Sequence, residues 1–242
     1  MQSLAQAREA ASAQSAALSN GVTAYHVAGD RGPWAVLVHG LVTPGYAWEP
    51  LSEVLVAQGF RVLRYDQLGR GLSDRPRVRY DLDLYVGQLR ELVDTLGIES
   101  VHLIGWSLGA VIVTRFAPEC PDRVASVAHL SRPYRFPDYS ERAREQLRFP
   151  GMAESFASTV ANYPAQGGDQ WASVGAHPRP VLVVWGTEDE VTPFANNARV
   201  LRLYPRAELL AVQGAKHAPH LDHPEIVHPA ILRHVMAAEN RP

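Results

Sequence analysis

Five segments of strand length, rich in apolar residues, recur along the chain and alternate with segments of helical spacing. The runs cover residues 34–38, 60–65, 101–104, 124–130 and 181–185. Two of them, 34–38 and 181–185, are apolar throughout, which is typical of strands that are covered on both faces. Their alternation with helices predicts the α/β class, a mostly parallel central sheet flanked by helices on both faces.

The segments between these runs complete the pattern. Helical spacing ends at a glycine in two of them, residues 48–58 before Gly59 and residues 81–96 before Gly97, as expected of helix C-caps. A further strand is predicted at 207–212 and a last helix at 224–237, while residues 22–27 alternate loosely and predict an edge strand. The chain of 242 residues, 46% of them hydrophobic, is long enough for one core of this type.

Two segments depart from the alternation. Residues 1–20 are rich in Ala, Gln and Ser with few large apolar side chains, so we expect a flexible N-terminal tail, either a frayed helix or disordered, before a single domain at 21–242. Residues 131–180 are richer in Arg, Pro, Tyr and Gly, with helix candidates at about 140–147 and at 152–162. If the second candidate belongs to the core, only a short lid insertion at about 131–150 remains.

Composition and charge exclude several classes of function. The formal net charge is −2 and no basic stripe is present, so a nucleic-acid partner is not expected. No apolar run approaches the roughly 18 residues of a membrane span, and the N-terminus lacks the pattern of a secretory signal. We therefore expect a cytoplasmic location. The single cysteine, Cys120, cannot form an internal disulfide, and the oligomeric state is not predicted.

The strongest chemical signal is the pentapeptide at residues 105–109, Gly-Trp-Ser-Leu-Gly. It follows the apolar run at 101–104 and precedes a helix candidate, which is the context of a nucleophile elbow. The flanking glycines leave room for a tight, strained turn, and Ser107 is presented at the carboxyl edge of the sheet. The alternative is a Gly-flanked serine in an ordinary strand–helix turn.

A serine hydroxyl needs a positioned base, and histidine with a carboxylate partner supplies one. Ser107, Asp189 and His217 each follow a predicted strand, so a parallel sheet brings them to one edge as a catalytic triad. Other carboxylates and histidines stand nearby and remain alternatives. They are Glu188, Glu190, His220, His223 and His228, the histidines being also conceivable zinc ligands, although the loop spacing does not favour a metal site.

The run at 34–38 ends in His39 and Gly40, which allow the chain to turn. The backbone N–H of Leu41 then becomes a candidate donor to an oxyanion hole, with the N–H of Leu108 as the other. We interpret His39 as a structural histidine more readily than as a proton carrier. His39, Trp48 and Trp106 are also tentative lining residues of the substrate pocket.

These pieces, in this order, resemble the α/β-hydrolase fold superfamily, in particular its group of serine esterases, haloperoxidase-like enzymes and lipases. The matching segments are 39–40, the Gly-rich loop 66–73, 105–109, 186–193 and 214–224. The resemblance implies a carboxylic-ester hydrolase that forms an acyl-enzyme, acts on a small-molecule ester and needs no cofactor or metal. The short lid implies a reduced cap, an open site and a preference for short acyl chains.

Other activities remain open within this resemblance. The elbow is similar to that of methyl-ester esterases acting on carrier-bound acyl chains, and thioesterases and perhydrolases share the fold. A non-catalytic ligand receptor is the alternative from a different class. Epoxide hydrolases and haloalkane dehalogenases are disfavoured, because they resemble this fold but carry Asp where Ser107 stands.

Overall fold

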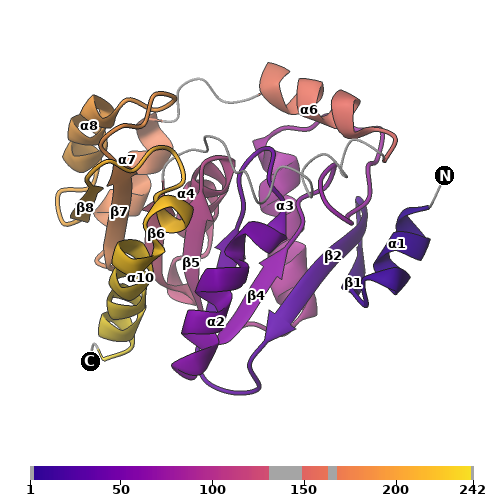
Figure 1. The fold of residues 1–242 in the computed structure, drawn as a ribbon, viewed down its shortest axis with the longest axis horizontal. Coiled ribbons are helices and arrows are strands. Elements are labelled where there is room, and N and C mark those ends of the chain that lie inside the picture. The colour runs from indigo at the N-terminus through magenta and orange to yellow at the C-terminus, as the bar shows by residue number, and fades with distance from the viewer. Residues whose placement is uncertain (1–2, 131–148, 163–167, 241–242) are drawn as a thin grey trace.

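The computed structural model describes residues 3–130, 149–162 and 168–240, and in them the chain forms an eight-stranded, mostly parallel sheet (Figure 1). The strand order is β1-β2-β4-β3-β5-β6-β7-β8, and β2 alone runs opposite to the other strands. The strands are β1 Gln14–Leu18, β2 Gly21–Ala28, β3 Trp34–Val38, β4 Arg61–Tyr65, β5 Val101–Trp106, β6 Val124–Leu130, β7 Val181–Gly186 and β8 Glu208–Val212. The predicted sheet is thereby confirmed.

Helices cover both faces of this sheet. One layer contains α3 (Leu82–Thr95), α4 (Leu108–Glu119), α7 (Gly168–Ala176) and α8 (Asn197–Leu203), and the opposite layer contains α2 (Glu49–Ala57) and α10 (Pro224–Glu239) (Figure 1). Successive side chains of a strand enter opposite cores, as in β3, where Val36 and Leu37 pack on different faces. The apolar runs of the sequence are continuous because both faces are buried.

The remaining described elements are short. They are helices α1 (Leu4–Ala10), α6 (Met152–Ala161) and α9 (Pro219–Asp222) and the 3₁₀ turns η1 (Gly45–Trp48), η2 (Pro121–Arg123) and η3 (Phe194–Asn196). Among the helices of the described residues, none is long and apolar enough to cross a membrane.

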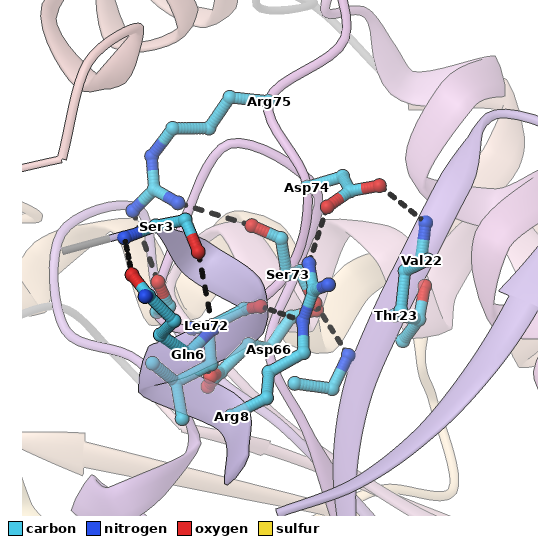
Figure 2. Close-up of polar contacts among 12 residues, drawn as sticks. Ser3, Gln6, Arg8, Val22, Thr23, Asp66, Leu72, Ser73, Asp74 and Arg75 are labelled. Carbon is cyan, nitrogen blue, oxygen red and sulfur yellow. Dashed lines mark hydrogen bonds and ion pairs between the residues drawn. The ribbon is translucent and has the colours of Figure 1, made fainter. Parts of the chain in front are cut away.

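The N-terminal segment differs from the flexible tail that the sequence predicts. Residues 3–18 contain α1 and strand β1, and β1 pairs with β2, so β1 rather than the segment around 22–27 is the sheet edge. Arg8 holds α1 against the loop after β4 (Figure 2). Its Nε donates to the Leu72 carbonyl at 2.7 Å, and its guanidinium pairs with the Asp74 carboxylate. Residues 3–18 are therefore polar because hydrogen bonds, rather than apolar packing, attach them to the rest of the fold.

The loop after β4 is organised by one partly buried carboxylate. Asp66 accepts hydrogen bonds from the backbone N–H of Gly45 and of Leu72, both at 2.8 Å (Figure 2 draws Asp66 and Leu72). Gly71 has φ 52°, and a Cβ there would lie 1.9 Å from the Asp66 carboxylate, so this glycine cannot be replaced. The Gly-rich loop is thus a structural connection held together by Asp66.

The helix at residues 152–162, expected in the core, lies elsewhere. Helix α6 crosses above the strand ends (Figure 1) and packs on the loop after β4. Its Ser155 hydroxyl contacts Gly69 and Arg70, and its Thr159 hydroxyl lies 2.7 Å from that of Tyr85. The helix that packs on the core next to α4 is α7, not α6. The insertion after β6 is therefore longer than 131–150, although residues 131–148, with the helix expected near 140–147, lie outside the described residues.

Candidate active site

Ser107 occupies a strained turn between β5 and α4. Its backbone has φ 58° and ψ −119°, a left-handed conformation that residues other than glycine rarely adopt. The two flanking glycines make the turn possible. A Cβ on Gly105 would lie 2.4 Å from the Gly109 carbonyl oxygen, and one on Gly109 would lie 2.0 Å from that of Val38. Ser107 is partly exposed, and α4 begins at the next residue.

Asp189 and His217 form a buried pair at the same edge of the sheet. His217 Nδ1 lies 2.8 Å from Asp189 Oδ2, and both side chains are almost fully buried. Asp189 Oδ1 accepts hydrogen bonds from the backbone N–H of Val191 at 3.0 Å and of Thr192 at 2.8 Å. These donors fix the carboxylate in one orientation, so that Nδ1 of the imidazole is the protonated nitrogen and Nε2 carries the lone pair; its role as a base stays a proposal.

Close contact between two loops brings the pair together. The Glu188 backbone N–H donates to the Ala215 carbonyl at 3.0 Å, and the Gly214 N–H donates to the Thr187 hydroxyl at 3.0 Å. A Cβ on Gly186 would lie 2.0 Å from the Lys216 carbonyl oxygen, so the loop after β8 can approach β7 only because residue 186 is a glycine.

The neighbouring acids and histidines have other roles in the structure. Glu188 and Glu190 are exposed, whereas Asp189 is buried. His228 Nε2 lies 2.9 Å from the His220 carbonyl oxygen, and His223 Nδ1 lies 3.3 Å from a Glu225 carboxylate oxygen. Within the described residues, no group of three His, Cys, Asp or Glu side chains is arranged to hold a metal ion.

The segment after β3 lies directly against the serine. A Cβ on Gly40 would be 3.2 Å from Ser107 Cβ and 3.6 Å from its Oγ, so Gly40 lies against the serine and Leu41 is the next residue along the chain. Leu108 is the first residue of α4, and N–H groups of a first helical turn have no intrahelical partner. Both expected oxyanion donors therefore lie beside Ser107, and their role in binding an oxyanion stays a proposal.

His39 has the geometry of a structural histidine. Its Nδ1 lies 2.6 Å from the Gly40 carbonyl oxygen, and its Nε2 accepts the Gln67 backbone N–H at 2.9 Å. Burial lowers the pKa of His39 to about 3, so the ring is neutral at physiological pH. With both nitrogens engaged, His39 holds the loop after β3 against the loop after β4, and its tentative role in the pocket has no support in this geometry.

Arg70 is a residue of this region that the sequence analysis missed. It is fully buried, and its Nε donates to the Leu41 carbonyl at 2.5 Å. Nη1 donates to the Ser155 hydroxyl at 2.9 Å and Nη2 to that of Thr159 at 3.2 Å. No carboxylate of the described residues pairs with Arg70. The cation thus links α6 to the loop that carries Leu41, and the sequence showed only an arginine in a Gly-rich loop.

Trp48 and Trp106 are both fully buried in the core between the sheet and the α2–α10 layer. The Trp106 indole Nε1 donates to the His217 carbonyl at 2.9 Å. The His220 ring stacks on Trp48 and meets Trp106 edge-on, at centroid distances of 4.5 Å and 4.9 Å. The two tryptophans, expected to line the pocket, therefore support the histidine loop from behind.

Comparisons with known proteins agree with this architecture. The model of the family described as alpha/beta hydrolase fold matches residues 33–165. Epoxide hydrolase B of Mycobacterium tuberculosis is 35% identical over 106 residues, 43% of this chain and 30% of that protein. Matches to the first curated relatives span only 29–30% of their length.

Longer but weaker similarities cover nearly the whole chain. The 2-(acetamidomethylene)succinate hydrolase of Mesorhizobium japonicum is 27% identical, covering 85% of this chain and 89% of that protein. The crystal structure of the enol-lactonase from Burkholderia xenovorans LB400 superposes with a TM-score of 0.79 at 23% identity, covering 92% of this chain and 100% of that chain. At this level of identity the structural likeness shows the fold alone.

Proposed function

Because the chain belongs to the alpha/beta hydrolase fold family, we propose that it is a serine hydrolase that cleaves carboxylic esters through an acyl-enzyme. One observation carries the proposal. The buried pair of His217 and Asp189, 2.8 Å apart, stands at the sheet edge where Ser107 is held in its strained turn. Nucleophile, base and orienting acid are thus supplied from three strand ends in the order Ser, Asp, His that this fold uses.

In the proposed reaction, Ser107 Oγ attacks the ester carbonyl carbon while His217 Nε2 accepts the hydroxyl proton. The carbonyl C–O π electrons move onto the oxygen. When the intermediate collapses, His217 returns the proton to the departing alcohol and Ser107 remains acylated. Water then repeats the sequence, with His217 as base, and releases the carboxylic acid. Asp189 stays ionised and stabilises the imidazolium at both stages.

Two backbone N–H groups, those of Leu41 and Leu108, stabilise the oxyanion. A single donor of this kind is worth about 3–4 kcal/mol in comparable enzymes. Arg70 supports the first donor, because its bond to the Leu41 carbonyl fixes that residue's backbone. Its buried charge also favours negative charge nearby, since the surrounding medium has a low effective dielectric.

Related activities fit the same machinery. A thioesterase, a perhydrolase or a methyl-ester esterase would use the same three residues, whereas a receptor on this fold would not need the aligned acid–base pair. The epoxide-hydrolase relative covers 43% of this chain. We propose ester chemistry over that activity, because a serine stands at 107 where epoxide hydrolases resembling this fold carry Asp.

The acyl preference is a separate question. The expected short lid pointed to short acyl chains, but α6 belongs to the segment above the strand ends, which removes part of the length argument. The arginines expected to make the lid polar, Arg132, Arg135, Arg142 and Arg144, lie outside the described residues. We retain short chains as the proposal, to be tested by kcat/KM on p-nitrophenyl esters of increasing acyl length. A steep optimum at long chains would contradict it.

The decisive variant is Ser107→Ala. We expect ester hydrolysis to fall by about 10⁴–10⁶-fold with an unchanged circular dichroism spectrum, because the nucleophile is lost and the fold is not. The measurement is kcat/KM with the best ester of the panel. A variant that retains a tenth of the wild-type rate would refute Ser107 as the nucleophile.

A further inference from the structure

The residue before the nucleophile touches the residue that carries the base. Trp106 is the last residue of β5, and its side chain points into the core between the sheet and the α2–α10 layer. From there its indole Nε1 reaches the main-chain carbonyl of His217 and donates a hydrogen bond at 2.9 Å. The nucleophile and the base, 110 positions apart in the chain, are thus joined through the neighbour of one and the backbone of the other.

His217 belongs to a segment whose neighbouring residues are held by other hydrogen bonds, while its own carbonyl accepts the bond from Trp106. It lies between the turn at Gly214 and the short helix α9. The adjacent Lys216 N–H donates to the Asp222 carboxylate at 3.0 Å, but that contact is exposed and therefore weakened by water. The bond from Trp106 is buried, so it keeps more of its strength. A rotation of the His217 backbone would displace the imidazole relative to Ser107, because the ring is at the end of the side chain.

The indole itself is fixed by aromatic packing. Trp48, Trp106 and His220 are fully buried. The His220 ring stacks on Trp48 with an interplanar angle of 29°, and meets Trp106 at 68°. Trp48 and Trp106 meet edge-on at a centroid distance of 6.4 Å. Aromatic contacts of these kinds contribute about 0.5–1.5 kcal/mol each, so the indole N–H has one orientation, toward the His217 carbonyl.

We propose that Trp106 is a positioning residue for the base, and that its indole N–H sets the backbone of His217 so that the imidazole faces Ser107. The inference rests on the proposed function for its kinetic consequence, but the hydrogen bond and its effect on the His217–Asp189 pair do not depend on the substrate. Trp106 acts through His217 and is not itself a group that touches the substrate.

The chain offers a matched control in Trp48. It is as deeply buried as Trp106 and belongs to the same cluster, but its Nε1 has no hydrogen-bond partner among the described residues. Trp106→Phe and Trp48→Phe each replace a bicyclic indole by a single phenyl ring and remove one N–H from the same core. Only the first removes a bond to the base, so the comparison separates positioning from packing.

The kinetic comparison uses the full chain and the best p-nitrophenyl ester. For Trp106→Phe we expect kcat to fall about 10–100-fold with KM changed less than twofold, because a displacement of the order of 1 Å at a reacting group costs about that much. The acid limb of the rate–pH profile should move to lower pH, since the imidazolium is then less well stabilised by Asp189. For Trp48→Phe we expect a smaller fall in kcat and a smaller shift of the profile than for Trp106→Phe, because an aromatic ring still packs against His220 and the bond from Trp106 to the His217 carbonyl is kept.

A second measurement needs no substrate. The proton between His217 Nδ1 and Asp189 should give a low-field NMR resonance in the wild type, which persists in Trp48→Phe and broadens or disappears in Trp106→Phe. If Trp106→Phe does not fold, site-specific replacement of either tryptophan by 3-benzothienylalanine preserves the bicyclic ring and removes only the N–H.

The outcomes are distinguishable. Equal kcat, equal pH profile and an equal resonance in the two variants would overturn the positioning role of Trp106, even if the protein is an esterase. Failure of wild type and Trp48→Phe to hydrolyse any ester would overturn the proposed function. The NMR comparison would still decide the hydrogen bond's role in that case.

Discussion

Gly109→Ala is the substitution whose cost the structure specifies most directly. An added Cβ would lie 2.0 Å from the Val38 carbonyl oxygen, 2.6 Å from its carbon and 2.7 Å from the His39 carbonyl oxygen. All three are backbone atoms of the β3 end, so no side-chain rotation relieves the contact. Helix α4 would have to move away from β3 by about 1 Å to restore even a tight contact.

Gly87→Ala is the matched control. Gly87 also lies in a helix, α3, and an added Cβ there meets nothing within 4 Å. Alanine in a helix is more favourable than glycine by about 0.5–1 kcal/mol, and both substitutions receive this gain. At Gly109 the overpacking, typically 1–3 kcal/mol and more against backbone, exceeds it. We expect a net loss of about 2–3 kcal/mol at Gly109 and a net gain at Gly87.

The assay is urea and thermal unfolding of the two variants beside the wild type. One kcal/mol shifts the Tm of a domain of this size by about 2–4 °C, so Gly109→Ala should unfold about 4–12 °C earlier and Gly87→Ala slightly later. The surviving folded Gly109→Ala should also hydrolyse esters more slowly, because α4 carries the Leu108 N–H. A Gly109→Ala protein as stable as the wild type would refute the close approach of α4 to β3.

Two further predictions concern titration and the acid of the pair. Asp189→Asn should lower kcat about 10⁴-fold, because its amide would donate to His217 Nδ1 and leave Nε2 protonated, whereas Glu190→Gln should have no effect; a large loss in the latter would reassign the acid. Burial lowers the pKa of His39 and of His129 to about 3, so the unfolded chain binds more protons below about pH 6.5 and stability falls as the pH drops from there toward 3. Each should cost about 2 kcal/mol at pH 5, and urea midpoints that are equal at pH 5 and 7.5 would contradict this.

Local pattern was enough to predict most of the sheet. The strands at 34–38 and 124–130 have the predicted bounds, because both faces are buried and most of their residues are apolar. The same logic failed for residues 1–20. Helix α1 and strand β1 are held by a capping box at Ser3, by pairing with β2 and by Arg8 on the loop after β4. Such long-range polar contacts leave no periodic signal.

The position of α6 could not be predicted for a related reason. Its amphipathic spacing is that of a core helix, but its inner face carries the hydroxyls of Ser155 and Thr159, which meet Arg70 and Tyr85. Whether an amphipathic helix covers a sheet or a loop depends on its tertiary partner. The sequence pattern predicts the helix but does not show which segment the helix packs on.

For the candidate site, spacing predicted which residues meet but not what supports them. Asp189 and His217 lie together as the strand-end argument requires. The bonds from Trp106 to the His217 carbonyl and from Arg70 to the Leu41 carbonyl involve backbone acceptors, which every residue has. No residue type at the acceptor position signals such a bond, so only the folded chain shows it.

The central claim is that Ser107 is an activated nucleophile, and covalent labelling tests it most directly. The folded wild type and Ser107→Ala are treated with a fluorophosphonate probe near neutral pH, and peptides are examined by mass spectrometry. The account predicts one adduct, on the peptide that contains Ser107, and none in the variant, with labelling slowed in Asp189→Asn. A folded wild type that is not labelled, or that is labelled at another residue, would contradict it.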